Sequence, residues 1–366
     1  MDDFYKKYCQ LRLKLAPFRT KAGFEYLKTV AQADGLSIRA YNIHNGSDAR
    51  SMFGPATADF SEAALMDRAF ELAESLERGE FPLSGKFCEP GGSLIDHSFI
   101  REGDVMHVFY NRGTIGYLWD QVFVDSIGHA TSRDLVHWEI QKPALAAQAG
   151  GHDDYQVWSP GVIRAGGKYL MYYTGVNINI AQAACIAESD DLYNWTRYAA
   201  NPVYTPGDWC SWSADKWSDC RDNMVFQDDD GKFYMYSCSS NSTGPVVSLA
   251  VSEDAYHWKD LGPISIAGVP TYEESPFVMK KDGRYYMFFT NVGIGTCYAV
   301  SDDPVKGWYA PEGNFLLPTC CSEVFEFGGK WYISAASYMG RGEQYLEIAE
   351  LFWNPDGSVR LGSFLR

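Results

Sequence analysis

The sequence predicts an all-β fold, a five-bladed β-propeller preceded by an N-terminal, mainly helical extension. Two repeated patterns lead to this prediction. In the first, a turn glycine precedes an aromatic-rich strand, at 103–111, 167–175, 231–238, 283–290 and 329–336. In the second, a short apolar strand, a serine and an acidic turn end at Trp138, Trp195, Trp258 and Trp308. These tryptophans are 57, 63 and 50 residues apart, a spacing typical of propeller blades.

The same units could also stack into an open solenoid. Closure into a ring is favoured because no terminal unit has a polar cap and because a ring leaves no long sheet edge exposed. We therefore expect residues 89–366 to form the propeller, with catalytic function, and residues 1–88 to form the extension. Leucine and alanine at helical spacing predict a helix over 61–79. The extension either packs on the propeller or makes a homo-oligomer contact.

Composition narrows the function classes. The chain of 366 residues carries a net charge of −16 and has no cluster of lysine and arginine, which argues against a nucleic-acid partner. No apolar run is long enough to cross a membrane. The nine cysteines contain no CxxC pair, and the first residues lack the apolar core of a signal peptide. These features predict a cytoplasmic protein with free thiols.

The blades differ at one position of their first strands. Counting nine residues back from the turn glycine gives Trp158, Asp222, Glu274 and Cys320, and a similar count in the first blade gives Asp96. The first strands line the axis of a propeller, so these positions converge. Like charges that gather in one place are costly unless they are protonated, paired or bound to a ligand. Asp96, Asp222 and Glu274 are therefore the predicted catalytic residues.

Converging carboxyl groups match the chemistry of glycoside hydrolysis. One carboxylic acid protonates the leaving oxygen, and a carboxylate opposite attacks the anomeric carbon or activates water. This reaction requires no cofactor. The alternative use of the three carboxylates, together with His97, is to bind Ca²⁺.

Other side chains are candidates for contact with substrate. Trp158 either stacks on a sugar ring or fills the axis. His97 follows Asp96, and a regular strand would turn its ring to the opposite face. A long aromatic insertion at 116–125 either walls the site or packs on the extension. The predicted substrate-binding residues are Arg221, Trp158, His97, Asp154, Trp119 and Asp120.

At these residues the sequence resembles the five-bladed propeller glycoside hydrolases of families 32, 43, 68 and 117. ATSRDLVHW (130–138) resembles the segment that closes the first blade in family 32, and CRDNMVF (220–226) resembles its Arg-Asp-Pro motif. YEESPFV (272–278) resembles the Glu-Cys-Pro motif of family 32 and the Glu-Gly-Pro motif of family 43. LIDHSFI (94–100) stands in the place of Asn-Asp-Pro-Asn. The likeness extends from about Gly91 to the C-terminus and is greatest to family 32, although the C-terminal β-sandwich of that family has no counterpart.

The resemblance implies a role for each carboxylate. Asp96 would be the nucleophile or general base, and Glu274 the general acid. Asp222, beside Arg221, would hold sugar hydroxyls and stabilise the transition state. Asn223 departs from the family proline. The implied activity is removal of a terminal furanosidic sugar, a fructoside or an arabinoside, from an oligosaccharide.

Two other functions remain alternatives at this stage. A glycoside phosphorylase on the same fold would need Arg, Lys or His clustered beside Glu274 to hold phosphate. A non-catalytic glycan-binding propeller would bind sugar without turnover.

Overall fold

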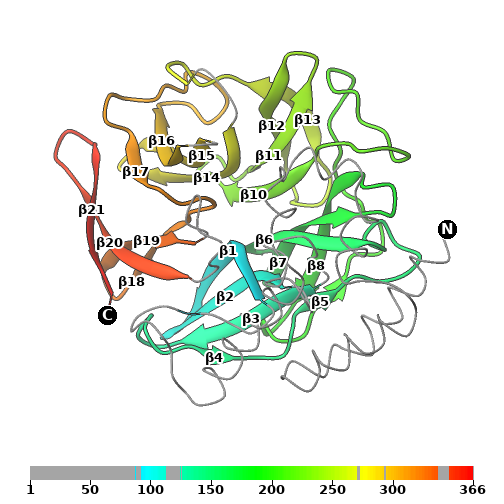
Figure 1. Cartoon of the computed structure of the whole chain (residues 1–366), viewed down its shortest axis with the longest axis horizontal. Helices are drawn as coiled ribbons and strands as arrows, with labels where there is room; N and C mark the ends of the chain where they lie inside the picture. The colour runs from blue at the N-terminus through cyan, green and yellow to red at the C-terminus, as the bar shows by residue number, and fades with distance from the viewer. Residues whose placement is uncertain are drawn as a thin grey trace, which may run out of the picture.

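The described part of the chain is a five-bladed β-propeller, as predicted (Figure 1). The computed structural model describes residues 87, 92–112, 124, 126–269, 273–291, 294–336 and 346–365. These residues form 21 strands in five antiparallel sheets. They include no helix long and apolar enough to cross a membrane. The predicted extension over 1–88 lies, apart from Phe87, outside the described residues, so its helix and its boundary stay predictions.

Each sheet is formed by strands that follow one another in the chain. Blade 1 consists of β1 (Gly92–Glu102), β2 (Val105–Arg112), β3 (Ser126–Ser132), β4 (Glu139–Ile140) and β5 (Leu145–Ala146). Blade 2 consists of β6 (Gln156–Ala165), β7 (Lys168–Val176), β8 (Gln182–Ser189) and β9 (Thr196–Arg197). Blade 3 consists of β10 (Arg221–Gln227), β11 (Phe233–Asn241), β12 (Gly244–Ser252) and β13 (Lys259–Ile264). Blade 4 consists of β14 (Glu273–Lys281), β15 (Arg284–Asn291), β16 (Gly295–Ser301) and β17 (Phe315–Leu317). Blade 5 consists of β18 (Val324–Phe327), β19 (Lys330–Ala335), β20 (Glu347–Trp353) and β21 (Val359–Phe364).

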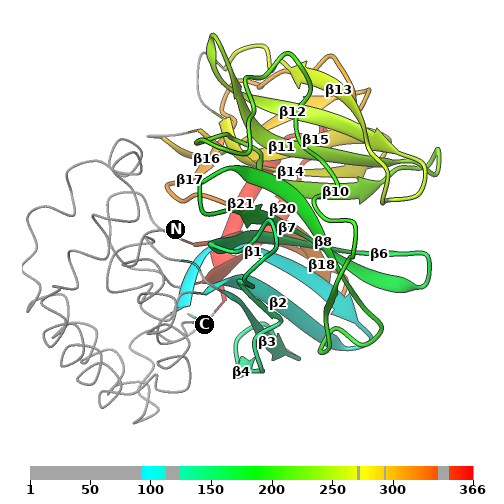
Figure 2. The same ribbon diagram turned by 90° about the vertical axis from the view of Figure 1, so that its right-hand side faces the viewer.

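The first strands of blades 1 to 4, which are β1, β6, β10 and β14, lie near the centre of the ring (Figure 1). β6 contacts both β1 and β10, and β10 contacts β14. Seen from the side, blades 3 and 4 lie on one side of β1 and β6, and β2 to β4 lie on the other (Figure 2). The starts of the innermost strands therefore meet in a small space on the axis.

The sheets are held together by apolar layers between neighbouring blades. Successive side chains of a strand point to opposite faces, and β11 uses both faces. Phe233 and Met235 pack toward blade 2, whereas Tyr234 and Tyr236 pack toward blade 4. Each large apolar side chain buried in this way contributes about 1.5–3 kcal/mol. The aromatic-rich strands recognised in the sequence are thus strands with a blade on either side.

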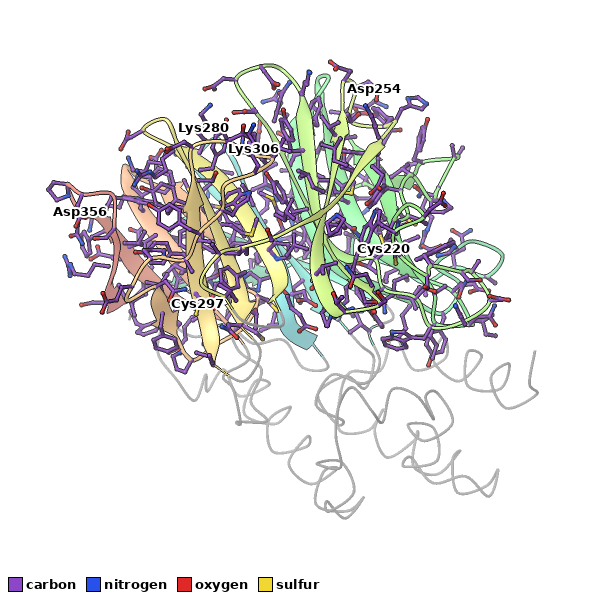
Figure 3. All side chains as sticks on the ribbon, turned by 90° about the horizontal axis from the view of Figure 1, so that it is seen from above. Cys220, Asp254, Lys280, Cys297, Lys306 and Asp356 are labelled. Carbon is purple, nitrogen blue, oxygen red and sulfur yellow. The ribbon has the colours of Figure 1, made fainter. Side chains whose placement is uncertain are left out.

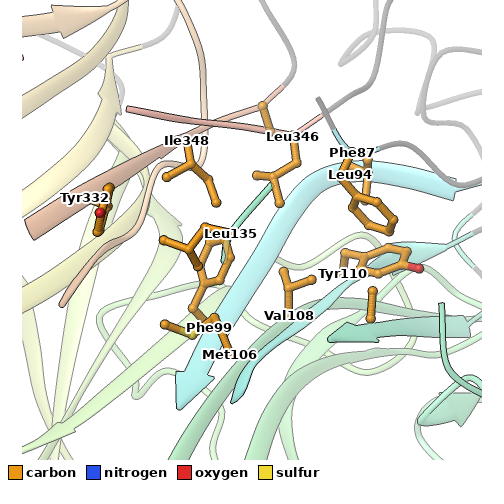
Figure 4. Packing of buried hydrophobic residues seen from close by; sticks show 12 residues of the cluster. Phe87, Leu94, Phe99, Met106, Val108, Tyr110, Leu135, Tyr332, Leu346 and Ile348 are labelled. Atoms are coloured by element: carbon orange, nitrogen blue, oxygen red, sulfur yellow. The ribbon is translucent and has the colours of Figure 1, made fainter. Parts of the chain in front are cut away.

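Blade 5 closes the ring against blade 1. Phe99 stacks on Phe325 with ring centroids 4.3 Å apart. Phe87 and Leu346 exchange two backbone hydrogen bonds, of 2.9 and 2.8 Å. Their side chains join one apolar cluster that draws residues from both blades (Figure 4). A closed ring excludes the alternative solenoid.

The repeated serine, acidic turn and tryptophan form one kind of turn. In blade 1, Asp134 Oδ1 accepts the backbone N–H groups of Val136 and His137 at 2.9 and 2.8 Å. Trp138 Nε1 donates to the carbonyl of Leu135, whose φ is 65°. All three bonds recur in blade 2. In blade 3 only the two bonds to the aspartate, Asp254, recur, and Trp258 Nε1 is buried without a hydrogen-bond partner. The motif therefore has a structural role in ending the third strand of a blade.

Candidate active site

The innermost strands are irregular at the level of the predicted site. The register shifts after Trp158 in β6, after Arg221 in β10 and after Glu274 in β14. β1 carries a shift between Gly92 and His97, a span that contains Asp96. The next residue in each of the other blades has a positive φ: Ser159 (48°), Asp222 (55°), Ser275 (50°) and Cys321 (57°). Bulges of this kind re-aim side chains and gather at functional sites.

These bulges correct one part of the sequence prediction. Asp222 and Glu274 are not at equivalent positions, because Glu274 is level with Arg221, and Asp222 is level with Ser275. The connection between β10 and β11 spans 228–232, whereas the one between β14 and β15 spans only 282–283. The turn glycine is therefore not at a constant distance from the axis.

Asp96 lies on the axis with its carboxyl group held by blade 1. Asn111 Nδ2 donates to Asp96 Oδ2 at 2.7 Å, and Asn111 Oδ1 accepts the backbone N–H of Ser159 at 2.7 Å. Burial, and then the negative charge of Asp222, raises the pKa of Asp96 to about 7. Near neutral pH this carboxyl group can hold a proton or release it.

Asp222 is anchored by donors from three blades. Ser159 Oγ donates to Asp222 Oδ1 at 2.7 Å. Oδ2 accepts the hydroxyl and the backbone N–H of Ser275 at 2.9 and 3.2 Å, and the thiol of Cys238 at 3.1 Å. Four donors fix the position of this carboxylate between blades 2 and 4.

Glu274 is paired with Arg221. Nη2 of Arg221 lies 2.5 Å from Glu274 Oε1, and Nη1 lies 2.7 Å from Asp219 Oδ1. The Arg221 side chain is 9% exposed, and those of Asp219 and Glu274 are 17% and 26% exposed. The guanidinium thus bridges two carboxylates, and Glu274 keeps an exposed portion for a ligand.

A cavity of about 40 Å³ lies on the axis next to Asp96 and Asp222. It is lined by the innermost strands of four blades and by Glu323, which lies just before β18. The pKa of Glu323 is raised to about 8 by burial, and its Oε2 accepts the backbone N–H of Phe99 at 2.8 Å. The structure therefore brings Asp96 and Asp222 together, and it places Glu274 beside them through Arg221.

The site belongs to one face of the propeller. Lys280 and Lys306 lie on the face of the β14–β15 hairpin turn, whereas Cys220 and Cys297 lie nearer the opposite face (Figure 3). Cys220 directly precedes Arg221 in the chain. Arg221 therefore lies nearer the face opposite the hairpin turns.

The predicted contact residues have different locations. Trp158 is partly exposed at the same level as Arg221, and its Nε1 donates to Gln156 Oε1 at 2.9 Å. Asp154 is partly buried in the loop before β6, where its Oδ1 accepts the backbone N–H of Ile178 at 2.9 Å. Trp119 and Asp120 lie outside the described residues.

His97 lines the axial cavity, where its ring is held by protein partners, and its role as a substrate contact stays a prediction. Its side chain is buried, with Nε2 2.7 Å from Ser334 Oγ and Nδ1 3.3 Å from the Leu94 carbonyl. Both ring nitrogens thus have protein partners, and the residue joins blade 1 to blade 5. The alternation of side chains along the strand, which turns His97 away from Asp96, was the sequence feature that indicated such a structural role.

Several polar residues of the site were not recognised in the sequence. Asn111, Cys238 and Ser275 contact Asp96 or Asp222, and Asp219 contacts Arg221. Ser275 could have been found, because it follows Glu274 directly. Asn111 and Cys238 lie on second strands, at the ends nearest the bulges, and no sequence signal marks them. Within the described ranges, no group of three or more His, Cys, Asp or Glu side chains is arranged to hold a metal ion.

Comparison with known proteins identifies relatives of the domain. Residues 97–275 match the model of the glycosyl hydrolases family 32 N-terminal domain. The insoluble beta-fructofuranosidase isoenzyme CWINV3 of Arabidopsis thaliana is 28% identical over 284 residues, which are 70% of this chain and 46% of the relative. Vacuolar acid beta-fructofuranosidase 1 of a Rosa hybrid cultivar is 34% identical over 106 residues, 27% of this chain and 17% of the relative. The chain therefore spans less than half the length of these relatives.

Solved structures share the fold. Fructan 1-exohydrolase IIa from Cichorium intybus aligns with a TM-score of 0.62 at 20% identity, over 76% of this chain and 60% of that one. A thermostable family-43 glycoside hydrolase aligns with a TM-score of 0.59 at 19% identity, over 75% of this chain and 93% of that one. Together with the family match, these similarities confirm the predicted relation to propeller glycoside hydrolases.

The predicted compartment is wrong. The curated relatives are described as vacuolar or insoluble enzymes, not as cytoplasmic ones. The absence of a CxxC pair and of an apolar leader-like core was too weak a basis for a cytoplasmic location.

Proposed function

We propose that this chain, a five-bladed propeller glycoside hydrolase, removes a terminal fructofuranosyl unit from sucrose-like or longer fructosides. The carboxyl groups at the axial end of β1, β10 and β14 carry the proposal. Asp96 and Asp222 share a buried space, and Arg221 holds Glu274 beside it at 2.5 Å. The fructofuranosidase relatives support a fructoside over an arabinoside.

In the proposed mechanism, Asp96 attacks the anomeric carbon or activates the water that does so. Glu274 gives a proton to the leaving oxygen, and water supplies the hydroxyl group of the released sugar. Asp222, fixed by four donors, faces the reacting carbon with its negative charge and stabilises the oxocarbenium-like transition state. The products are fructose and the shortened saccharide.

The protonation state of Asp96 sets a condition on this mechanism. Asp96 acts as a nucleophile or base only when it is ionised, and its pKa is raised to about 7. On the acid side of this value the free site holds its proton on Asp96. Binding of substrate or a higher pH must remove that proton before Asp96 can act.

The phosphorylase alternative has less support. Arg221 is the cation paired with Glu274 among the described residues, and its guanidinium already bridges Glu274 and Asp219. A bound phosphate would have to compete with both carboxylates for the same charge.

The experiment is a substrate panel in phosphate-free buffer with the released sugars separated by chromatography. We expect fructose from sucrose or 1-kestose and a fall of at least about 100-fold in kcat for Glu274→Gln on these natural leaving groups. Glu253→Gln, an 81% exposed position in blade 3, is the matched control. Release of arabinose or xylose alone, a requirement for phosphate, or full activity of Glu274→Gln would each overturn the proposal.

A further inference from the structure

A tryptophan-rich segment, 209–219, connects blade 2 to β10 of blade 3, the strand that carries Arg221 and Asp222. Its tip, 213–218, is closed by two hydrogen bonds between Ser213 and Ser218, of 2.9 and 2.8 Å. The turn between β7 and β8 holds it from outside, since Asn177 Nδ2 donates to the Ala214 carbonyl at 2.8 Å. Gln182 donates its backbone N–H to the Ser218 carbonyl at 3.0 Å. The tip is therefore pre-organised.

Trp217, in this tip, is connected to the proposed acid by a chain of contacts. Its Nε1 donates to Asp219 Oδ1 at 3.1 Å, and the same oxygen accepts Arg221 Nη1 at 2.7 Å. Arg221 in turn holds Glu274 at 2.5 Å. Ser240 Oγ fixes the other oxygen of Asp219 at 2.7 Å. The orientation of the indole is thus tied to that of Glu274.

The three tryptophans of the segment have different surroundings. Trp209 donates to Asp260 Oδ2 and Trp212 to the Gln182 carbonyl, each at 2.8 Å, so both are tied to the blades. Trp217 is tied instead to Asp219, which is part of the site. It is partly exposed, and its only polar atom is already used. What it offers a ligand is the face of its ring, which packs well against the C–H face of a sugar.

We propose that Trp217 is a specificity-determining residue that stacks on the first sugar ring of the leaving group. In this proposal Glu274 protonates the leaving oxygen, and the leaving group lies on the side of Glu274 that Arg221 and Asp219 occupy. This inference rests on the proposed function. It names the residue by which the site would favour a fructoside with a sugar leaving group over one with a simple alkyl leaving group.

The test is the ratio of kcat/KM for 1-kestose to that for methyl β-fructofuranoside, which has no sugar ring in its leaving group. A ratio cancels any general loss caused by removing the hydrogen bond to Asp219. Trp217→Ala should lower the ratio by about 3- to 10-fold, the effect of one stacking contact. Trp217→Phe keeps a ring without the N–H and should keep most of the ratio. Trp209→Phe, in the same segment, is the matched control.

Three results would contradict either the stacking inference or the proposed function. If the unmodified protein hydrolyses fructosides and Trp217→Ala leaves the ratio unchanged, the stacking inference is overturned and the proposed function stands. If Trp217→Phe lowers the ratio as much as Trp217→Ala, the hydrogen bond and not the ring face sets specificity, which also overturns it. If the unmodified protein hydrolyses neither substrate, the proposed function itself fails.

Discussion

Replacing Arg221 with methionine should destabilise the protein by more than the loss of an ordinary ion pair. The methionine keeps much of the apolar stem but leaves Asp219 and Glu274 without their shared cation. Removing one partner of a fully buried pair costs about 3–5 kcal/mol. Asp219 and Glu274 retain 17% and 26% exposure, so water screens part of this penalty. We therefore expect the free energy of unfolding to fall by about 2–3 kcal/mol.

The assay is urea unfolding followed by tryptophan fluorescence, with Arg133→Met as the control. Arg133 pairs with Asp104 at the surface, where the two side chains are 68% and 80% exposed. Pairs as exposed as this one contribute little to stability, because water screens them. If Arg221→Met lowers the free energy of unfolding no more than Arg133→Met does, then Arg221 does not hold Asp219 and Glu274 in place, and the geometry assigned to Glu274 is wrong.

Three further predictions concern pH. Because the pKa of Asp96 is raised to about 7 and the residue acts when ionised, kcat/KM for sucrose should rise as pH increases through about 7; a profile that falls there would make Asp96 the acid instead. Nδ1 of His107 lies 3.0 Å from Nε2 of His129, and burial lowers the pKa values of the two residues to about 4 and about 3. The stability that the neutral pair contributes is therefore fully present above about pH 6.5 and is lost as pH falls toward these values. His129→Phe should flatten the decline in Tm between pH 6.5 and 4.5, and an unchanged decline would contradict this. Burial raises the pKa of Glu323 to about 8. The stability that its protonated form contributes is therefore fully present below about pH 4.5 and is lost as pH rises through 8. The difference in Tm between Glu323→Gln and the unmodified protein should be more favourable to the variant at pH 8.5 than at pH 5, and the same difference at both pH values would refute this.

Much of the architecture follows from the sequence because all five blades carry the aromatic-rich strand and four of them carry the turn that ends in tryptophan. The aromatic-rich second strands pack blades on both sides, and the turns of blades 1 and 2 make the same hydrogen bonds. These are local requirements that recur along the chain, so they leave a repeated pattern. The identity of Asp96 and Asp222 as axial residues follows from the same pattern, because both interrupt an otherwise apolar strand start.

The details of the site depend on features that no local pattern records. The level of Glu274 relative to Asp222 depends on hairpin length, which differs between β10–β11 and β14–β15. Asn111 and Cys238 reach the carboxylates from second strands, and Asp219 reaches Arg221 from the segment between blades. Such contacts are set by how five sheets meet.

The central claim is that the axial carboxylates hydrolyse a fructoside, and the turnover of sucrose by Asp96→Asn tests it most directly. Asparagine keeps the shape of Asp96 but cannot attack or accept a proton. We expect kcat/KM to fall by about 1,000-fold or more relative to the unmodified protein, with no loss in Asp302→Asn, a surface control whose side chain is 88% exposed. Turnover by Asp96→Asn within two-fold of the unmodified protein would contradict the account.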